Sequence, residues 1–489
     1  MKKITSHILI SILAGVCISC TSSPNQEKIM QKKEVTLIAV SPVITKRTTE
    51  NNPALATTYC ADPTAVEYNG RLYVYATNDH QMYKNLKADE EVNYGYINTL
   101  VIFSTDDMAN WTYHGEIEVT KTAKWARNSW APSIASRVEE DGLTHFYLFF
   151  ADGGNGVGVL TSTSPTGPFT DPIGKPLVCR TTKGLGNCEW IFDPGVCIND
   201  KGEGYLSFGG GPKSDNCKIV KLGKDMISLE SDIISLLNAK QHFEANELNY
   251  VNGTYYLSYC SNWTDKPIAN MMYITSKTPL DADSWEWKGS FFKNTGDFGL
   301  GGGNNHTHIQ QFKDKFYLLY QAHDMHSVLG VKGDCRNVNL DEVIFDTNND
   351  VIKDVKGTKT GVQQIATVNP FELTLASKTA TGSGYGFKND SGKITVVAET
   401  RDGVGAWTMV KKADFSKSPD SFTATVKGNG IIRVYADTYD ISEEPLCELN
   451  FDNDDFSAVT ADITEKITGE HNICFVFTNG IEFESWKFN

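Results

Sequence analysis

Short runs of apolar residues, each ending in small polar residues, recur along the middle of the chain. The five clearest runs are rich in aromatic and β-branched residues, and most follow a glycine or a charged turn residue. They span residues 71–77, 145–152, 204–210, 254–261 and 315–322. Such runs predict β-strands, and several precede a second strand with a Ser- or Thr-rich end, as at 100–105, 157–163 and 272–276.

A tyrosine stands at the same place in each of the five runs. These residues are Tyr73, Tyr147, Tyr205, Tyr256 and Tyr317, so neighbours lie 74, 58, 51 and 61 residues apart. A repeat of this length, with about four short strands in each unit, is typical of a β-propeller. Five units predict five blades over residues 58–357. The alternative is a generic β-sandwich in which the spacing is a coincidence.

The pattern changes after residue 357. We expect a linker over 358–370 and a small antiparallel β-sandwich, of jelly-roll type, over 371–489. Its predicted strands are 394–399, 407–410, 421–426, 431–436, 473–477 and 483–488. The predicted fold class is therefore all-β, a five-bladed β-propeller followed by a β-sandwich.

The first 19 residues have the pattern of a secretory signal peptide. Two lysines precede an apolar stretch, 8–16, that is too short to span a bilayer. Cys20 follows a serine there and resembles the lipidated first residue of bacterial lipoproteins. Several acyl chains would anchor the protein to the bacterial cell envelope, on its periplasmic or its outer face. Cleavage at Cys17 or secretion without lipid are the alternatives, and the polar residues 20–57 are expected to form a tether.

The net charge and the cysteine content limit the kinds of ligand and metal ion that the protein is expected to bind. The formal net charge is −15, and removal of residues 1–19, with two lysines and no acid, changes it to −15 − 2 = −17. A net negative charge argues against a nucleic-acid partner, because it repels phosphates. It does not disfavour binding of a neutral, hydroxyl-rich ligand. Nine of the 11 cysteines lie after Cys20, and none of these forms a C-x-x-C pair, which disfavours a zinc site. Cys179 and Cys188 could bridge within a loop, and most cysteines are expected to be buried.

A second periodicity lies upstream of the aromatic runs. Asp62 and His306 each precede the tyrosine of their run by 11 residues. Asp193 and Glu244 each precede theirs by 12, and Trp130 with the following Ala-Pro-Ser occupies this slot in the second unit. Because the first strand of each propeller blade lines the central channel, these slots should converge on one ring around the axis.

Three carboxylates on one rim fit the chemistry of glycoside hydrolysis. Two carboxyl groups flanking the glycosidic bond suffice, provided that one is ionised and the other is protonated near neutral pH. A third carboxylate beside the acid raises the pKa of the acid by like-charge repulsion. The set therefore predicts a base, an acid and a residue that tunes the pKa of the acid.

Several short motifs surround these residues. They are Ala61-Asp-Pro, Trp130-Ala-Pro-Ser, Thr163-Ser-Pro-Thr-Gly-Pro-Phe, Phe192-Asp-Pro, Phe243-Glu-Ala, Asn304-Asn-His and the stretch from Arg336 to Asp346. In combination they resemble glycoside hydrolase family 43, the five-bladed propellers that include β-xylosidases, α-L-arabinofuranosidases and arabinanases. The resemblance covers about residues 58–357.

The resemblance implies a role for each carboxylate. Asp62 looks like the general base that activates water, Asp193 like the modulator of the acid's pKa, and Glu244 like the general acid. Members of the family invert configuration, which implies a base and an acid roughly 6.5–9.5 Å apart, so that a water fits between them. Glu247 is the alternative candidate for the general acid, but its position in the repeat does not match that of the other carboxylates.

Other residues are expected around this set. His306 resembles the family's channel histidine, often a ligand of a structural Ca²⁺ through water; a satisfied core histidine is the alternative. His308 is expected to point to the opposite side. Arg336 resembles the family arginine that contacts substrate or the carboxylates, unless it is a salt-bridged rim residue.

Three aromatic or imidazole side chains are further candidates for sugar contacts. Trp130 is expected to form an apolar wall for the sugar, with core packing as the equal alternative. Trp263 and His80 follow the channel strands and are expected to shape neighbouring subsites.

The C-terminal region resembles carbohydrate-binding module family 6, in residues 405–415 and 483–488. The acidic start of that family is replaced here by Leu375-Ala-Ser, so the ligands of its structural calcium are missing. A sugar-binding role would rest on exposed aromatic rings, and Trp407 and Trp486 are equally candidates for the core. Otherwise this domain supports the propeller.

The leading hypothesis is an inverting glycosidase that removes α-L-arabinofuranosyl or β-D-xylosyl units from plant arabinoxylan or arabinan. It needs no organic cofactor, has no nucleic-acid partner and meets the membrane only through its lipid anchor. A non-catalytic glycan-binding surface lipoprotein is the alternative. A fructan-hydrolase propeller is disfavoured, because the Asn-Asp-Pro-Asn-Gly opening of that group is absent.

Overall fold

A computed structural model describes residues 35–489, except for 214, 263–267 and 332–333. Residues 35–489 form one compact unit. The predicted signal peptide, the lipidation site at Cys20 and the sugar-contact candidate Trp263 all lie outside the described residues.

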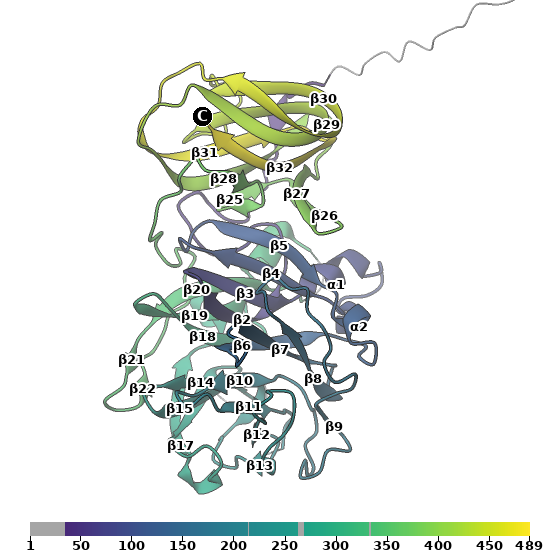
Figure 1. The fold of residues 1–489 in the computed structure, drawn as a ribbon, viewed down its shortest axis with the longest axis vertical. Helices are drawn as coiled ribbons and strands as arrows, with labels where there is room; N and C mark the ends of the chain where they lie inside the picture. Colours follow the sequence, from purple (N-terminus) through teal and green to yellow (C-terminus); the bar gives the residue numbers. More distant parts are fainter. Residues whose placement is uncertain (1–34, 214, 263–267, 332–333) are drawn as a thin grey trace, which may run out of the picture. The chain divides into compact units, whose positions relative to one another are not determined.

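The middle of the chain forms five sheets arranged as the blades of a propeller (Figure 1). Blades one and two comprise β2 (Ala61–Tyr68), β3 (Arg71–Thr77), β4 (Leu100–Thr105), β5 (Trp111–Ile117), then β6 (Trp130–Val138), β7 (Thr144–Ala151), β8 (Gly156–Ser162) and β9 (Val178–Cys179). Blades three and four comprise β10 (Gly195–Ile198), β11 (Gly204–Phe208), β12 (Lys218–Lys221), β13 (Ile234–Ser235), then β14 (His242–Val251), β15 (Thr254–Ser261), β16 (Met271–Ser276) and β17 (Glu286–Phe292). Blade five comprises β18 (Thr307–Phe312), β19 (Lys315–Ala322) and β20 (Asn337–Val343).

The predicted five-bladed architecture is confirmed. The aromatic runs are β3, β7, β11, β15 and β19, the second strand of each blade. Their apolar side chains fill the layers between neighbouring blades, which explains why β-branched and aromatic residues recur there. Helices are short and lie in loops: α1 (Asp79–Asn85), α2 (Val119–Thr122), α3 (Asp324–Leu329), η1 (Tyr94–Tyr96), η2 (Ala282–Ser284) and η3 (Thr295–Phe298).

The first strands of neighbouring blades pack around the axis and are joined by side-chain hydrogen bonds. The backbone N–H of Ile134 donates to Thr64 Oγ1 at 3.2 Å, and that of Val196 donates to Ser133 Oγ at 3.0 Å. Between blades four and five, Asn249 Nδ2 donates to the Ile309 carbonyl at 2.8 Å. Two further hydrogen bonds between blades, accepted by the Asp193 and Gln321 side chains, belong to the site described below. Each blade is thus positioned by its neighbour.

The segment before the first blade closes the ring against the last one. The N–H of Ala54 donates to Val338 O at 2.8 Å, and the N–H of Cys60 donates to Arg336 O at 2.9 Å. The side chain of Asn52 accepts from the N–H of Leu340 at 2.8 Å and donates to its carbonyl at 2.9 Å. The start of the domain therefore covers the outer edge of β20.

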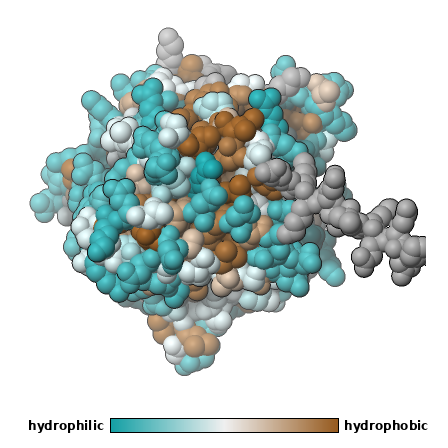
Figure 2. Space-filling view, turned by 90° about the horizontal axis from the view of Figure 1, so that it is seen from above, coloured by the Kyte–Doolittle hydropathy of each residue, from teal (hydrophilic) through white to brown (hydrophobic). Residues whose placement is uncertain are grey.

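The C-terminal region is a β-rich domain, as predicted. After the hairpin β21 (Phe345–Asp346) and β22 (Val351–Ile352), its strands are β23 (Thr374–Leu375), β24 (Lys378–Thr379), β25 (Thr381–Ser383), β26 (Tyr385–Asp390), β27 (Lys393–Ala398), β28 (Val404–Phe415), β29 (Ser421–Ala436), β30 (Cys447–Asp462), β31 (Gly469–Phe477) and β32 (Ile481–Phe488). Seen from above, this end of the molecule is mostly hydrophilic, with patches of hydrophobic residues among the polar ones (Figure 2).

Two predicted strands of the sandwich are in fact one. Residues 421–426 and 431–436 are the two halves of β29, which continues through an irregularity at Gly428. Gly428 has φ +102°, a conformation that glycine adopts without strain, so the glycines there bend the strand instead of ending it. The first half pairs with β32 and the second with β31. Strand β30 was not predicted, because its middle is rich in Asp and Asn and it pairs with β29 alone.

The predicted tether is structured in part. Within residues 20–57, β1 (Ala39–Val40) pairs in parallel with β28 of the sandwich. From β1 onward the chain therefore crosses the sandwich before it enters blade one.

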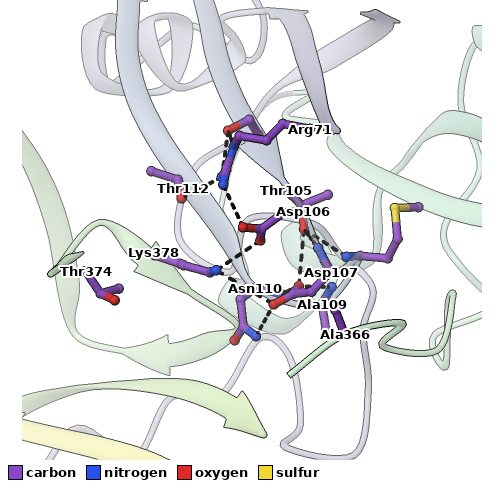
Figure 3. A network of polar contacts seen from close by, with 12 residues as sticks. Arg71, Thr105, Asp106, Asp107, Ala109, Asn110, Thr112, Ala366, Thr374 and Lys378 are labelled. Atoms are coloured by element: carbon purple, nitrogen blue, oxygen red, sulfur yellow. Dashed lines mark hydrogen bonds and ion pairs between the residues drawn. The ribbon is translucent and has the colours of Figure 1, made fainter. Parts of the chain in front are cut away.

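The sandwich is joined to blade one by backbone, stacking and ionic contacts. Strand β24 pairs with β5, and the Tyr113 and Phe387 rings stack with centroids 4.2 Å apart. In Figure 3, Asp106 lies between two cations: its Oδ1 is 2.9 Å from Lys378 Nζ and its Oδ2 is 2.8 Å from Arg71 Nη1. The sandwich is thus an extension of the first blade rather than a separately tethered module.

None of the nine cysteines among the described residues is in a disulfide, and eight of them are buried. The bridge considered between Cys179 and Cys188 is therefore not formed. Among the described residues, no helix is long and apolar enough to cross a membrane.

Candidate functional site

A cavity of about 120 Å³ opens at one end of the central channel. Its lining combines carboxylates, cations, amides and aromatic rings: Asp62, Thr77, Tyr94, Ile97, Trp130, Ala131, Phe192, Asp193, Glu244, Ala245, Asn304, Asn305, His306 and Arg336. All five blades contribute to it. The three predicted carboxylates, separated by up to 182 residues (244 − 62), therefore meet in one cavity.

A repeated backbone irregularity marks the rim where the innermost strands begin. Asp62, Ala131, Asp193 and Ala245 all have positive φ, between 39° and 61°. In blades one, two and four the pairing of the first two strands shifts register at this point. Non-glycine residues rarely adopt this conformation, and strained backbone of this kind gathers at functional sites.

The Asp62 carboxylate is nearly buried and lies between the Arg336 guanidinium and the His306 imidazole. Its Oδ1 is 3.1 Å from Arg336 Nη1 and 3.2 Å from His306 Nδ1. Its N–H donates to Gln321 Oε1 at 3.1 Å. Burial raises the pKa of Asp62, but Arg336 and His306 outweigh it and lower the pKa to about 2. Asp62 is therefore ionised at neutral pH, as a base must be.

Glu244 has the opposite electrostatic environment. Burial, followed by the charge of Asp193, raises the pKa of Glu244 to about 8. Its side chain is partly exposed at the cavity, so a substrate can reach it. Glu244 is therefore mostly protonated at neutral pH, as an acid must be.

Asp193 lies beside Glu244 and is fixed by the backbone of blade four. Its Oδ2 accepts a hydrogen bond from the N–H of Ala245 at 2.7 Å. Burial, opposed by His306 and reinforced by Asp62, raises the pKa of Asp193 to about 6. Because Asp193 ionises before Glu244, its negative charge is present while Glu244 still holds its proton.

His306 contacts Asp62 and lines the cavity. Burial lowers the pKa of His306, but the hydrogen bond and charge of Asp62 reverse the effect and raise it. In the described part of the chain, no group of three or more His, Cys, Asp or Glu side chains could hold a metal ion. A calcium ion held through water beside His306 stays a prediction, and Nδ1 of His306 contacts Asp62 Oδ1 at 3.2 Å.

Glu247, the rival acid, lies deeper in the channel and does not line the cavity. Only 1% of it is exposed, and its carboxylate contacts His308 Nδ1 at 2.7 Å and the Ser133 hydroxyl at 3.3 Å. The expectation that His308 points to the opposite side was wrong. Residues two apart on an extended chain share a face, so both His306 and His308 face the channel.

The other predicted residues fall into two groups. Trp130 lines the cavity, where its ring packs edge-on against Tyr94, with centroids 6.1 Å apart. Arg336 also lines it and is buried. His80 does not line it; its ring packs between Tyr59 and Tyr83, at 6.0 and 5.7 Å between centroids.

Several residues of the site were not predicted. Tyr94 lines the cavity and its hydroxyl donates to Asp334 Oδ2 at 2.6 Å. Gln321 contacts both Asp62 and Arg336, and Asp79 binds Arg336. The one available signal was position: Asp79 lies two residues after the second strand of blade one, and Gln321 is the last residue but one of the second strand of blade five.

Comparison with known proteins gives a consistent relationship. A family model described as Glycosyl hydrolases family 43 matches residues 50–349. The arabinoxylan arabinofuranohydrolase of Bacillus subtilis (strain 168) is 35% identical over 92% of this chain and 94% of its own length. That of Paenibacillus polymyxa is 32% identical over 90% of this chain and 74% of its own. A crystal structure of the Bacillus subtilis enzyme in complex with cellotetraose has a TM-score of 0.84 and 33% identity, covering 91% of this chain and 99% of that one.

Proposed function

The chain belongs to glycosyl hydrolase family 43, and on this premise we propose that it removes α-L-arabinofuranosyl units from arabinoxylan by inverting hydrolysis. β-D-xylosyl units are the second candidate. The observation that carries the proposal is the pair of opposite environments in one cavity, which keep Asp62 ionised and Glu244 protonated.

Each carboxylate has one task in the proposed reaction. Asp62 accepts a proton from a water molecule, whose oxygen attacks the anomeric carbon. Glu244 gives its proton to the glycosidic oxygen as the carbon–oxygen bond breaks, so the leaving group departs as a neutral alcohol. One bond to the anomeric carbon forms and one breaks on opposite faces, which inverts its configuration. Asp193 keeps Glu244 protonated at neutral pH.

The shape of the site supports removal of single terminal or branching sugars. The cavity of about 120 Å³ is small, Trp130 and Tyr94 belong to its lining, and the buried pair of Glu247 and His308 does not line it. We propose that the sugar that enters it is the end of a chain or a branch. The polysaccharide main chain would remain outside.

The names of the two relatives favour arabinose as the sugar removed. Both are called arabinoxylan arabinofuranohydrolases, and both match almost the whole of this chain, including the sandwich. The alternative of a non-catalytic glycan-binding protein has no support, because a binding site does not need two carboxyl groups in opposite protonation states.

The test is hydrolysis of arabinoxylan oligosaccharides with the products followed by NMR. We expect release of arabinose whose first-formed anomer has the β configuration. Release of xylose alone would favour the second candidate, and release of the α anomer would exclude inversion. Absence of any product from aryl arabinofuranoside and aryl xyloside, with glycan binding retained, would overturn the proposed activity.

We infer a structural role for the C-terminal sandwich. Trp407 and Trp486, the candidates for sugar stacking, are 0% and 1% exposed, so both belong to the core. The Trp407 ring stacks on Tyr439 with centroids 4.0 Å apart. Strand β24 and the Tyr113–Phe387 contact tie the domain to blade one instead.

We also propose that the protein is anchored to the bacterial envelope through Cys20, as the sequence motif suggests. Metabolic labelling with a radioactive fatty acid would test it. Label in the wild-type protein and none in a Cys20→Ala variant is the expected result. Equal label in both, or none in either, would overturn the proposal.

A further inference from the structure

We propose that Asp79, a residue outside the catalytic cavity, positions the base Asp62 by fixing the orientation of the Arg336 guanidinium. The inference rests on the proposed function of Asp62. It assigns to Asp79 a positioning role, because the carboxylate acts through Arg336 and does not line the cavity.

The Asp79 carboxylate accepts three hydrogen bonds from Arg336. Its Oδ2 accepts from Arg336 Nε at 2.8 Å and from the Arg336 backbone N–H at 2.9 Å. Its Oδ1 accepts from Arg336 Nη2 at 2.9 Å. The Asp79 side chain has no exposed surface, so water does not compete for these bonds. Such a bidentate pair is the strongest and most directional contact an arginine makes.

The hydrogen bonds to Asp79 determine where Nη1, the third nitrogen of the Arg336 guanidinium, lies. The guanidinium is planar and rigid, so holding Nε and Nη2 fixes the direction of Nη1. Nη1 then lies 3.1 Å from Asp62 Oδ1 and 3.2 Å from Gln321 Oε1. The Tyr94 ring lies against the guanidinium carbon, 5.5 Å from its centroid. The arginine therefore has a single available orientation.

The position of Asp79 is itself determined locally. It is the first residue of α1, directly after Asn78, whose side chain accepts the N–H of Gln81 at 3.1 Å and starts the helix. The strand β3 that leads to Asn78 pairs with β2, which carries Asp62. Asp79, Arg336 and Asp62 are thus held by elements of the same two neighbouring blades, one and five.

The charges around Arg336 support the same role for Asp79. Arg336 is 4% exposed and faces two carboxylates, so its single positive charge is shared between them. Removing Asp79 would leave a buried arginine free to turn, and such an arginine would seek water or other acceptors. Asp62 would then lose a cation, and the pKa of Asp62 would rise.

The decisive experiment is a double-mutant cycle of Asp79→Asn and Arg336→Gln, assayed on aryl α-L-arabinofuranoside across the acid range. We expect Asp79→Asn to lower kcat roughly 10- to 100-fold and to move the acid limb of kcat/KM to higher pH. In the Arg336→Gln background, Asp79→Asn should lower kcat by less than about threefold, because the effect of Asp79 passes through Arg336.

Other outcomes overturn the inference. A downward shift of the acid limb would mean that Asp79 acts only through its own charge. An unchanged limb would mean a structural role, and full additivity in the cycle would mean independence from Arg336. Asp341→Asn is the matched control: Asp341 is also buried and hydrogen-bonded, to Tyr320 and Thr358, but outside the cavity. It should lower stability without moving the acid limb.

A failure of the proposed function can be told apart from a failure of the inference about Asp79. If the wild-type protein hydrolyses no pentoside, NMR titration of the Asp62 carboxyl in wild type and Asp79→Asn still tests the coupling, with a higher pKa expected in the variant. If Asp79→Asn does not fold, Asp79→Ser leaves room for water and should show the same upward shift. An unchanged Asp62 pKa in the folded variant would overturn the inference.

Discussion

The carboxylate of Asp193 accepts the backbone N–H of Ala245, the residue next to Glu244, at 2.7 Å. One hydrogen bond thus connects the third and fourth blades at the point where the proposed acid stands. It holds a negative charge beside Glu244, and that charge, after burial, is the largest cause of the raised pKa of Glu244.

Replacing Asp193 by Asn should shift the pH dependence of the reaction. The amide oxygen can still accept from Ala245, but the negative charge is lost, so the pKa of Glu244 falls. Since only protonated Glu244 can act as acid, the basic limb of kcat/KM should move to lower pH, by about one unit. A pH–rate profile with arabinoxylan oligosaccharides measures it. An unmoved basic limb would show that Asp193 does not tune the acid.

Replacing Asp62 by Asn should remove the base and leave the fold intact. We expect kcat to fall roughly 10²- to 10⁴-fold on every substrate, including aryl glycosides, because the attacking water loses its proton acceptor in all cases. Circular dichroism should match the wild type. Turnover above this range would exclude Asp62 as the base.

Replacing Glu244 by Gln should affect substrates unequally. Natural oligosaccharides need protonation of the leaving oxygen and should lose roughly 10²- to 10⁴-fold in kcat, whereas aryl glycosides with good leaving groups should lose much less. Equal losses on the two kinds of substrate would contradict the acid role.

The same variant should be more stable than the wild type at about pH 8. The pKa of Glu244 is about 8 in the folded state and about 4.3 in an unfolded chain, so the folded state favours the protonated form. Its stabilising contribution is therefore present below about pH 4 and is lost as the pH rises toward 8. Glutamine removes this pH-dependent loss, and thermal unfolding at about pH 8 should show a higher Tm. An equal or lower Tm would argue against a buried, protonated Glu244.

Replacing Glu247 by Gln should reduce stability and leave the chemistry unchanged. The variant removes a buried acceptor of His308 and Ser133, which we expect to lower the free energy of unfolding by about 1–3 kcal/mol. The basic limb of the pH profile should not move. A shifted limb, or a selective loss on poor leaving groups, would restore Glu247 as the acid.

The propeller and the sandwich should unfold together. Strand β24 completes the sheet of blade one, and Lys378 pairs with Asp106 of the propeller. Calorimetry should therefore give one cooperative transition, and deletion of residues 371–489 should lower the Tm of the remainder. Two separate transitions would show independent domains.

Much of the architecture could be predicted from the chain alone, for a simple reason. Strands such as 71–77, 254–261 and 315–322 coincide with β3, β15 and β19, because each is a continuous apolar run buried between blades. Strand β30 escaped prediction because its acidic middle lies on an exposed edge, where packing selects no apolar residue.

The repeat in the sequence was enough to predict the number of blades and the three carboxylates, since it places equivalent residues around one axis. The charge states and the partners of these carboxylates follow from the folded ring alone. Asp79, Gln321 and Tyr94 occur once each and follow no repeat, and their contacts to Arg336 and Asp62 join blade one to blade five. A pKa depends on distances and burial in space, and these arise only when the ring of blades has closed.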